Sequence, residues 1–374
     1  MLNPSSIVRF FIGTMFIAAC GANDQNRQQN SDRSINVGRP AISAAAPDSG
    51  SVQLNAPYPP SPVQTPLVPP PGAAMSLADM TGYTFQLALD NEFVYWAEYT
   101  RGNGLWRVPR SGGAKQQIAS VNPYARGVVA DKTHVYFTSD AQADGLGGPP
   151  VLYRVGKSGG PVELVAREVQ SGHLATDGQR VFWLSNTGLF SIEGAQPATL
   201  IANVHGSNIV YDRGRLFYHR DKTIYRLPLG SGKEVKVADT EAIFREMAVD
   251  SDFVYWSESG PLEMPPPPKC RPGIPCAMPS AVPRMPNGII KRASLADGSI
   301  TTLATKQDNV GEVAVDNTHV YWASSEAVVR VNKLGGPAQV VHAFQGRGAP
   351  HPMSISSNLL YFAAGGTVYV RSVD

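Results

Sequence analysis

The sequence predicts an all-β fold: a β-propeller of seven blades with four strands each, closed into a ring by a strand from the N-terminal side. Three observations favour it. From about residue 74 onward, four short apolar segments separated by turn residues recur seven times. About 300 residues over seven copies give about 43 residues per copy, the length typical of a propeller blade. The last copy lacks its fourth segment, and a matching segment stands before the first copy.

Residues 1–19 predict a secretion signal. Arg9 precedes the apolar run 10–19, which is too short to span a bilayer as a helix and fits the apolar part of a signal peptide. The next residue is Cys20, and residues 17–21 resemble the lipobox of bacterial lipoproteins. That resemblance implies lipidation of Cys20 and a membrane anchor, with Gly21 arguing against retention in the inner membrane. An ordinary cleaved signal followed by a chance cysteine is the alternative.

Residues 20–73 predict a disordered tether. This segment is rich in Pro, Gln, Asn and Ser, and neither helical nor strand periodicity runs through it. Such a composition cannot bury enough apolar area to offset the entropy lost on ordering. We therefore expect a spacer that holds the domain 74–374 away from the membrane.

Each copy of the repeat is recognised by an anchor residue that ends its first apolar segment. An aromatic residue follows five positions after each anchor, and a Gly-rich turn separates the third and fourth segments in several copies. Asp side chains bond to nearby backbone in turns, and Gly adopts positive φ there. We therefore assign the Asp residues to turn capping rather than to catalysis. The anchors are Asp90, Asp131, Asp177, Asp212, Asp250, Asp316 and, in the last copy, Ser356.

The ring is predicted to close through the segment 74–79. It matches the fourth segment of the other copies, and the seventh copy ends at residues 368–371 without one. Pairing the two would protect the exposed edges of the sheet. A linker with a chance apolar pair is the alternative.

The repeat resembles a known family of propellers. Residues 94–96, 254–256 and 320–322 read Val-Tyr-Trp, and Ala-Val-Asp or a similar triplet precedes them. These motifs resemble the YWTD repeat of low-density-lipoprotein-receptor propellers and, more closely, that of bacterial envelope propellers of unknown function. The resemblance implies an architecture and almost nothing about activity. Because YWTD propellers usually have six blades, six blades stay the alternative.

The interval between Asp250 and Asp316 is the longest between anchors, which predicts a loop insertion at 260–288 between a second and a third strand. It contains Cys270 and Cys276. In an oxidising compartment these two cysteines are expected to form a local disulfide. A zinc pair is the alternative, but no neighbouring Cys or His supplies the remaining ligands. The loop is either a recognition element or a decoration.

The residues four positions before the anchors are expected to face the central channel or its mouth. Glu246, Glu312, Asn208 and His173 could together hold a divalent cation such as calcium. Some propeller lactonases and lyases hold a metal in this place, an analogy that rests on the fold alone. The other interpretation is a hydrated channel in which Glu246 or Glu312 pairs with Arg245 or Arg126. The seven positions are Gln86, Gly127, His173, Asn208, Glu246, Glu312 and Pro352.

Composition limits the function classes. A net charge of +2 without long charge runs argues against a nucleic-acid surface. Together with the lipobox resemblance and the repeat, this leads to the first hypothesis: a monomeric, lipid-anchored scaffold module of the bacterial envelope that binds a protein or a glycan and needs no cofactor. It would sit on the outer membrane and face either the periplasm or the exterior. The alternatives are a metal-dependent lactonase- or lyase-like enzyme using the channel residues, and a structural role without a ligand.

Overall fold

A computed structural model describes residues 65–98, 104–120, 125–139, 150–170, 173–263, 285–344 and 352–373. All of them belong to one compact unit of the chain, Ala56–Asp374. The regular secondary structure in these ranges is entirely β-strand. The same ranges contain no helix of the length and apolarity that crossing a membrane requires.

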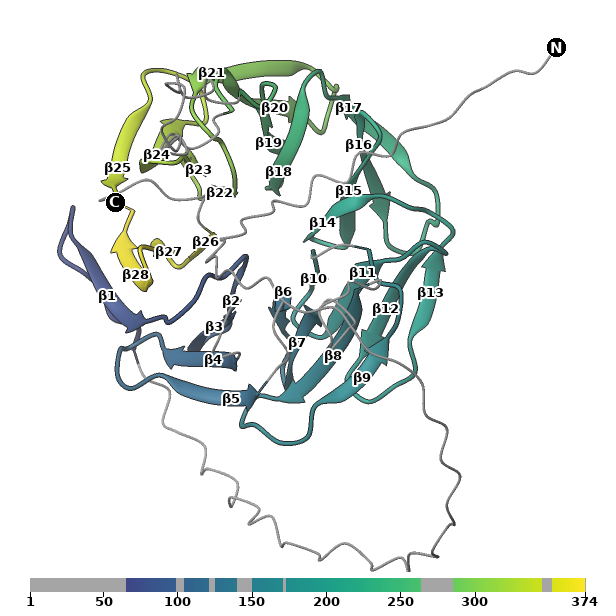
Figure 1. Cartoon of the computed structure of the whole chain (residues 1–374). Helices are drawn as coiled ribbons and strands as arrows, with labels where there is room; N and C mark the ends of the chain where they lie inside the picture. The colour runs from purple at the N-terminus through teal and green to yellow at the C-terminus, as the bar shows by residue number, and fades with distance from the viewer. Residues whose placement is uncertain are drawn as a thin grey trace, which may run out of the picture. The chain divides into compact units, whose positions relative to one another are not determined.

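The strands form seven antiparallel sheets of four, arranged around a centre as the blades of a propeller (Figure 1). The innermost strands are β2 (Leu87–Leu89), β6 (Ala125–Ala130), β10 (Ala175–Thr176), β14 (Ser207–Asp212), β18 (Ile243–Val249), β22 (Val313–Val315) and β26 (Met353–Ser356). The second strands are β3 (Phe93–Ala97), β7 (His134–Ser139), β11 (Arg180–Leu184), β15 (Arg215–Arg220), β19 (Phe253–Ser259), β23 (His319–Ala323) and β27 (Leu359–Ala364).

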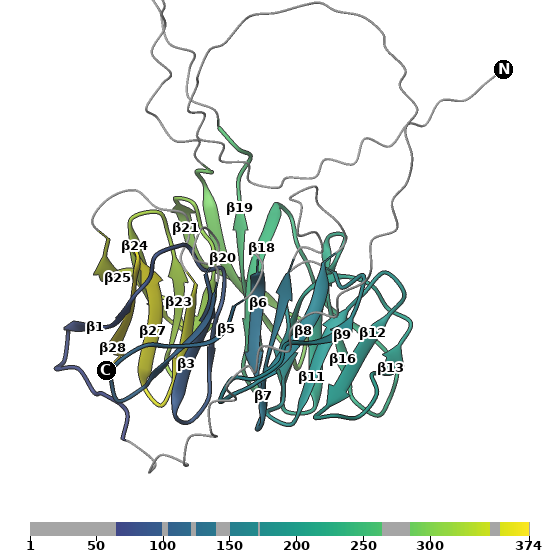
Figure 2. The same ribbon diagram turned by 60° about the horizontal axis from the view of Figure 1, so that its bottom comes forward.

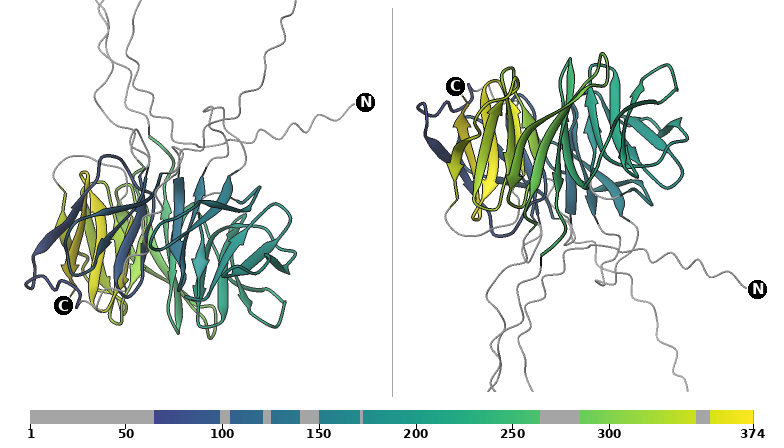
Figure 3. Two further views of the ribbon diagram at one scale, coloured as in Figure 1. Left: turned by 90° about the horizontal axis from the view of Figure 1, so that it is seen from below. Right: turned by 90° about the horizontal axis from the view of Figure 1, so that it is seen from above.

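The outer half of each blade consists of a third and a fourth strand, and side views show the sheets standing next to one another in a single ring (Figure 2 and Figure 3). The third strands are β4 (Gly104–Pro109), β8 (Val151–Gly156), β12 (Leu189–Glu193), β16 (Thr223–Pro228), β20 (Gly288–Ser294), β24 (Ala327–Asn332) and β28 (Thr367–Ser372). The fourth strands are β5 (Gln116–Ser120), β9 (Glu163–Ala166), β13 (Thr199–Ala202), β17 (Val235–Asp239), β21 (Ile300–Gln307), β25 (Gln339–Ala343) and β1 (Ala74–Asp79).

The seventh blade joins the two ends of the domain. β1 pairs antiparallel with β28, in a register that places Ala74 opposite Arg371 and Asp79 opposite Thr367. Figure 1 shows the purple strand β1 lying beside the yellow strand β28. The predictions of seven blades and of closure by an N-terminal strand are therefore confirmed, and the six-blade alternative is wrong.

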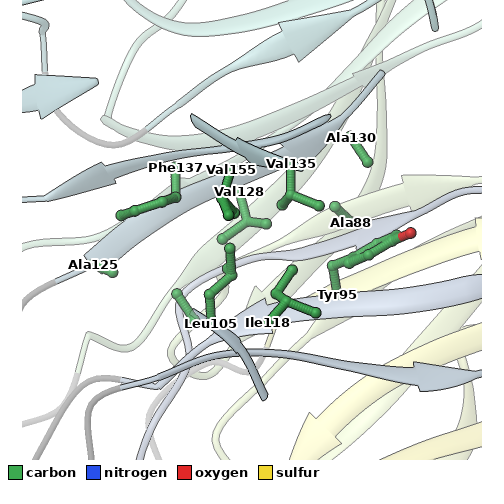
Figure 4. Packing of buried hydrophobic residues seen from close by; sticks show 11 residues of the cluster. Ala88, Tyr95, Leu105, Ile118, Ala125, Val128, Ala130, Val135, Phe137 and Val155 are labelled. Carbon is green, nitrogen blue, oxygen red and sulfur yellow. The ribbon is translucent and has the colours of Figure 1, made fainter. Parts of the chain in front are cut away.

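The core lies between blades rather than inside any one of them. One cluster joins Tyr95 and Leu105 of the first blade to Val128 and Phe137 of the second (Figure 4). The second strands are covered by a neighbouring blade on both faces, so that Tyr95 is fully buried. Aromatic and β-branched residues suit such a position, because they pack well against the pleated surface of a sheet. This explains the aromatic pairs in the repeat.

At one end of the blades, which we call the turn face, each innermost strand turns into the second strand. Five of the anchor Asp residues cap this turn by accepting the backbone N–H groups two and three positions ahead. In the fifth blade, for example, both bonds to Asp250 Oδ1 measure 2.9 Å, and Tyr255 Oη donates to the other oxygen at 3.0 Å. The five are Asp90, Asp131, Asp177, Asp250 and Asp316.

The fourth blade departs from this rule. Asp212 does not cap its turn, because Arg213 and Gly214 form the turn with φ values of 45° and 78°. Its carboxylate pairs with Arg215 instead. The assignment of turn capping to the Asp anchors is thus confirmed in five blades and wrong for Asp212.

Lysines tie some capped turns to the next blade. Lys157 of the second blade pairs with Asp90 of the first at 2.7 Å, and Lys333 of the sixth pairs with Asp250 of the fifth at 2.6 Å. These ion pairs are largely shielded from solvent. The turn face is therefore a repeated structural device that holds strands within a blade and blades to one another.

The insertion between Asp250 and Asp316 falls between β19 and β20, the second and third strands of the fifth blade. Cys270 and Cys276 lie outside the described residues, as do Cys20 and the tether. The disulfide and the lipid anchor therefore stay predictions.

Candidate functional site: a polar network at the channel mouth

The end of the ring opposite the turn face is where the innermost strands begin, and we call it the channel mouth. Asn208 is the second residue of β14, and Glu246 is the central residue of β18. His173 comes shortly before β10, and Glu312 directly precedes β22. The pairing register shifts between Ser207 and Val210 and again between Phe244 and Met247. Each shift is a β-bulge, which adds a residue to one strand and redirects its side chains.

Glu246 is the centre of a network that spans three consecutive blades. Its Oε1 lies 3.1 Å from Nε2 of His173, and its Oε2 accepts a hydrogen bond of 3.0 Å from Nδ2 of Asn208. The side chains of His173 and Glu246 are 33% and 23% exposed. The network is thus partly shielded but still open to a ligand.

Asn208 is held in an unusual backbone conformation. Its φ is 53°, in the left-handed region that side-chain-bearing residues other than Asn and Asp rarely adopt. Its Nδ2 also donates a 2.8 Å hydrogen bond to the carbonyl of Arg245. The side chain of Asn208 therefore links the fourth blade to both residues of the bulge in the fifth.

Glu312 brings a second carboxyl group close to the first. Burial and the nearby negative charge of Glu246 raise the pKa of Glu312 well above its usual range. Burial by itself would lower the pKa of His173, but the charge of Glu246 and its hydrogen bond outweigh burial and raise it. Burial also lowers the pKa of Arg245, an effect that the charge of Glu246 opposes.

The structure brings together three of the four predicted site residues by direct contact, namely His173, Asn208 and Glu246. Glu312 interacts with them through its charge. The hydrated-channel interpretation expected Glu246 or Glu312 to pair with Arg245 or Arg126. For Glu246, the contacts that the structure shows are with His173 and Asn208.

Other channel positions are used differently. Gln86 Oε1 accepts a 2.9 Å hydrogen bond from the backbone N–H of Val128, which joins the first two blades. The backbone N–H of Gly127 donates to Thr138 Oγ1 at 2.9 Å. These two positions therefore serve the frame of the channel rather than its opening.

The geometry of the channel mouth gives little support to the predicted cation site. Each oxygen of Glu246 accepts from one nitrogen donor, which leaves a further lone pair on each oxygen. In the described ranges of the chain, no three His, Cys, Asp or Glu side chains are gathered as metal ligands. The divalent cation stays a prediction that metal analysis can test.

Exposed apolar side chains lie at the mouth end of the first and fifth blades, and the sequence reasoning missed them. Tyr83 is 73% exposed and Phe85 is 48% exposed on the segment that leads into β2. The guanidinium carbon of Arg126 lies 5.4 Å from the centre of the Phe85 ring. Ile243 at the start of β18 and Leu262 beyond the end of β19 are also exposed. Two aromatics placed directly before the channel position Gln86 were the available signal.

Comparison with known proteins places the chain by its fold alone. No protein-family model matches it, and no curated protein matches it. It is similar to the computationally designed protein Ika8 (TM-score 0.49, 12% identity, 79% of this chain and 99% of that one). It is also similar to BamB from Moraxella catarrhalis (TM-score 0.49, 12% identity, 78% and 84%). A protein of unknown function from Bacteroides thetaiotaomicron gives a TM-score of 0.44 at 12% identity, over 80% and 72% of the two chains. Likenesses this distant carry no argument about function.

Proposed function

We propose that this protein is a lipid-anchored propeller of the bacterial envelope that binds a partner protein at its channel mouth. The observation that carries the proposal is the Glu246 network, in which neighbouring blades contribute different side chains at equivalent positions. Gln86 and Gly127 at the equivalent positions bond to the frame of the channel, whereas the side chains of the Glu246 network interact with one another across blades. Charged groups in a partly shielded site commonly mark functional positions.

The surroundings of the network favour a protein as the partner. Phe85 presents aromatic surface beside Arg126, and Tyr83 is exposed two positions earlier on the same segment. Ile243 and Leu262 add exposed aliphatic surface to the fifth blade, which carries Glu246. Buried aromatic anchors with a polar surround are typical of protein–protein interfaces. The exposed aromatics can also stack on a sugar ring, so a glycan is the other outcome that the experiment must distinguish.

Site-specific crosslinking in the native host tests this proposal. A photo-crosslinking amino acid replaces Tyr83 at the channel mouth or, as the matched control, Leu334 on the turn between β24 and β25, which is 88% exposed. We expect a defined protein adduct from position 83 that disappears when Glu246→Gln and Phe85→Ala are added. An adduct of equal yield from position 334, or none from position 83, would contradict the proposal. A carbohydrate adduct from position 83 would make the ligand a glycan.

The lipid anchor is tested separately, because the protein can bind a partner with or without it. In cells given a labelled fatty acid, we expect the label on the wild-type chain and not on Cys20→Ala. Incorporation into Cys20→Ala, or an unlabelled wild-type chain, would remove the anchor from the proposal and leave the binding face untouched.

A further inference from the structure

A second site lies at the turn face, and it becomes visible when equivalent arginines are compared. In four blades an arginine on the third strand reaches a backbone carbonyl of the next blade. Arg107 donates to the carbonyl of Lys157 at 2.7 Å, and Arg330 donates to that of Val373 at 2.9 Å. The other two pairs are Arg154 with Gly194 and Arg292 with Lys333. The guanidinium groups therefore act as latches between blades.

In three of these blades a polar residue on the fourth strand also holds the guanidinium. The acceptor lies nine positions after the arginine and receives a hydrogen bond from Nε. For Arg154 it is Glu163, at 2.8 Å. For Arg107 and Arg330 it is Gln116 at 3.0 Å and Gln339 at 3.3 Å. A complete latch thus has one acceptor in the next blade and one in its own.

Arg226 occupies the same position in the fourth blade, opposite Phe217, but its latch is open. Its Nε is buried without a hydrogen-bond partner, and its guanidinium forms no ion pair within the described part of the chain. The position nine residues later is Val235, which cannot accept a hydrogen bond. A buried guanidinium nitrogen without an acceptor is costly. Nε of Arg292 in the fifth blade also lacks an acceptor, but that guanidinium still reaches the carbonyl of Lys333, whereas Arg226 reaches no carbonyl of the next blade among the residues that the structure describes.

A cavity of about 240 Å³ lies where the latch would close. Arg226 lines it together with residues 235–237 of β17 and the turn 294–298 of the fifth blade. Lys236 at the rim already pairs with Asp239, and Asp297 already accepts the N–H of Ser299. Val235 is 41% exposed, and Ile300, just after the turn, is 48% exposed. The cavity therefore offers one available guanidinium with apolar surface beside it.

We propose that this cavity binds the carboxylate of an aspartate or glutamate side chain from a bound polypeptide. The planar fork of a guanidinium matches a carboxylate in a two-bond arrangement. The carboxylate of Asp297 at the rim repels a doubly charged phosphate more strongly than a singly charged carboxylate. Exposed Val235 in the lining gives an apolar contact to a residue beside the acidic one, which a free acid lacks. The site is independent of the channel mouth, because it lies at the other end of the blades.

Titration of the full chain with blocked tripeptides tests the proposal. The probe is acetyl-Ala-Glu-Ala-amide, its controls are the Gln counterpart and inorganic phosphate, and NMR shifts or calorimetry report binding. We expect saturable binding of the Glu peptide in the millimolar range, as befits a ligand of this size. Arg226→Gln should weaken it by about tenfold or more, since a charged hydrogen-bond pair is lost.

Two further variants make the test specific. Val235→Gln supplies the internal acceptor found in other blades, so it should occupy Arg226 and abolish binding without removing the arginine. Arg330→Gln removes an arginine whose latch is closed, so it should leave binding unchanged. Equal binding to wild type and Arg226→Gln, no preference for Glu over Gln, or binding of phosphate alone would overturn the proposal.

Discussion

The two ends of this propeller are built on opposite principles. At the turn face, five blades place an Asp in the same position and use it for the same pair of backbone hydrogen bonds. At the channel mouth, the seven equivalent positions carry six different residue types. A feature repeated around a ring serves the ring, whereas the side chains of Glu246 and its partners interact with one another in only part of the ring. The comparison directs attention to the channel mouth for function.

The same contrast appears in how well the polar groups are satisfied. Asp250 receives two backbone N–H groups, a tyrosine hydroxyl and a lysine. At the channel mouth, Glu312 lies beside another carboxylate, and Asn208 has a left-handed backbone. Such local costs persist where the surrounding structure holds them, and they gather at functional sites.

The largest effect is expected from Asp250→Ala, which should lower the free energy of unfolding by about 3 kcal/mol. The substitution removes the turn cap and leaves Tyr255 and Lys333 without their partner. Denaturant unfolding followed by tryptophan fluorescence measures the change. Asp252, two positions along the chain, is exposed, and its carboxylate accepts from the Ser251 hydroxyl rather than from a backbone N–H, so Asp252→Ala should stay within about 0.5 kcal/mol. Equal effects of the two variants would show that the repeated Asp is not the stabilising element.

A substitution at the channel mouth should act in the opposite direction. We expect Glu312→Gln to stabilise the fold by about 1 kcal/mol at pH 8, because it removes a charge that burial and Glu246 disfavour. The pKa of Glu312 is raised in the folded state, so its favourable contribution is present below the unfolded pKa and is lost as pH rises through the folded value. The difference between variant and wild type should therefore be small at pH 4 and grow toward pH 8.

The control for this prediction is Glu326→Gln, an exposed carboxylate in the same blade. It should change stability by less than about 0.5 kcal/mol at either pH. His173 and Arg245 also titrate near this site, so the Glu312→Gln comparison is repeated in a His173→Gln background. A destabilising Glu312→Gln, or a gain that is largest at pH 4, would mean that Glu312 has a favourable partner as a carboxylate.

The fold was predictable from the sequence because its information is local and repeated. The anchors and the aromatic residues five positions later recur in each copy, and the segment 74–79 matches the fourth segment that the last copy lacks. One correct alignment of the copies therefore yields all seven blades. Asp212 was misassigned because the turn residues Arg213 and Gly214 replace the cap, although a Gly at that point was visible in the sequence.

The site was only partly predictable, for a different reason. Counting four positions back from each anchor found His173, Asn208, Glu246 and Glu312. It could not find their pairing, because bulges in β14 and β18 change which side chains meet across blades. Tyr83 and Phe85 were missed because they precede the repeat unit. The missing hydrogen bonds of Arg226 could be recognised only after the structure showed the bonds that the equivalent arginines form.

An effect no larger than that of Glu312→Gln is expected at Asn208, where two substitutions separate the contribution of the backbone from that of the side chain. Both Asn208→Ala and Asn208→Gly remove the hydrogen bonds to Glu246 and to the Arg245 carbonyl. Both replacements must adopt a φ near 53°, but only alanine has a Cβ atom that makes this conformation sterically unfavourable. We therefore expect Asn208→Ala to be less stable than Asn208→Gly by about 1 kcal/mol in denaturant unfolding. The reverse order would mean that the backbone relaxes out of the left-handed region once the side chain is gone. In that case the hydrogen bonds of the Asn208 side chain would impose the left-handed backbone conformation. The bulges would then result from the network and would not be what positions it.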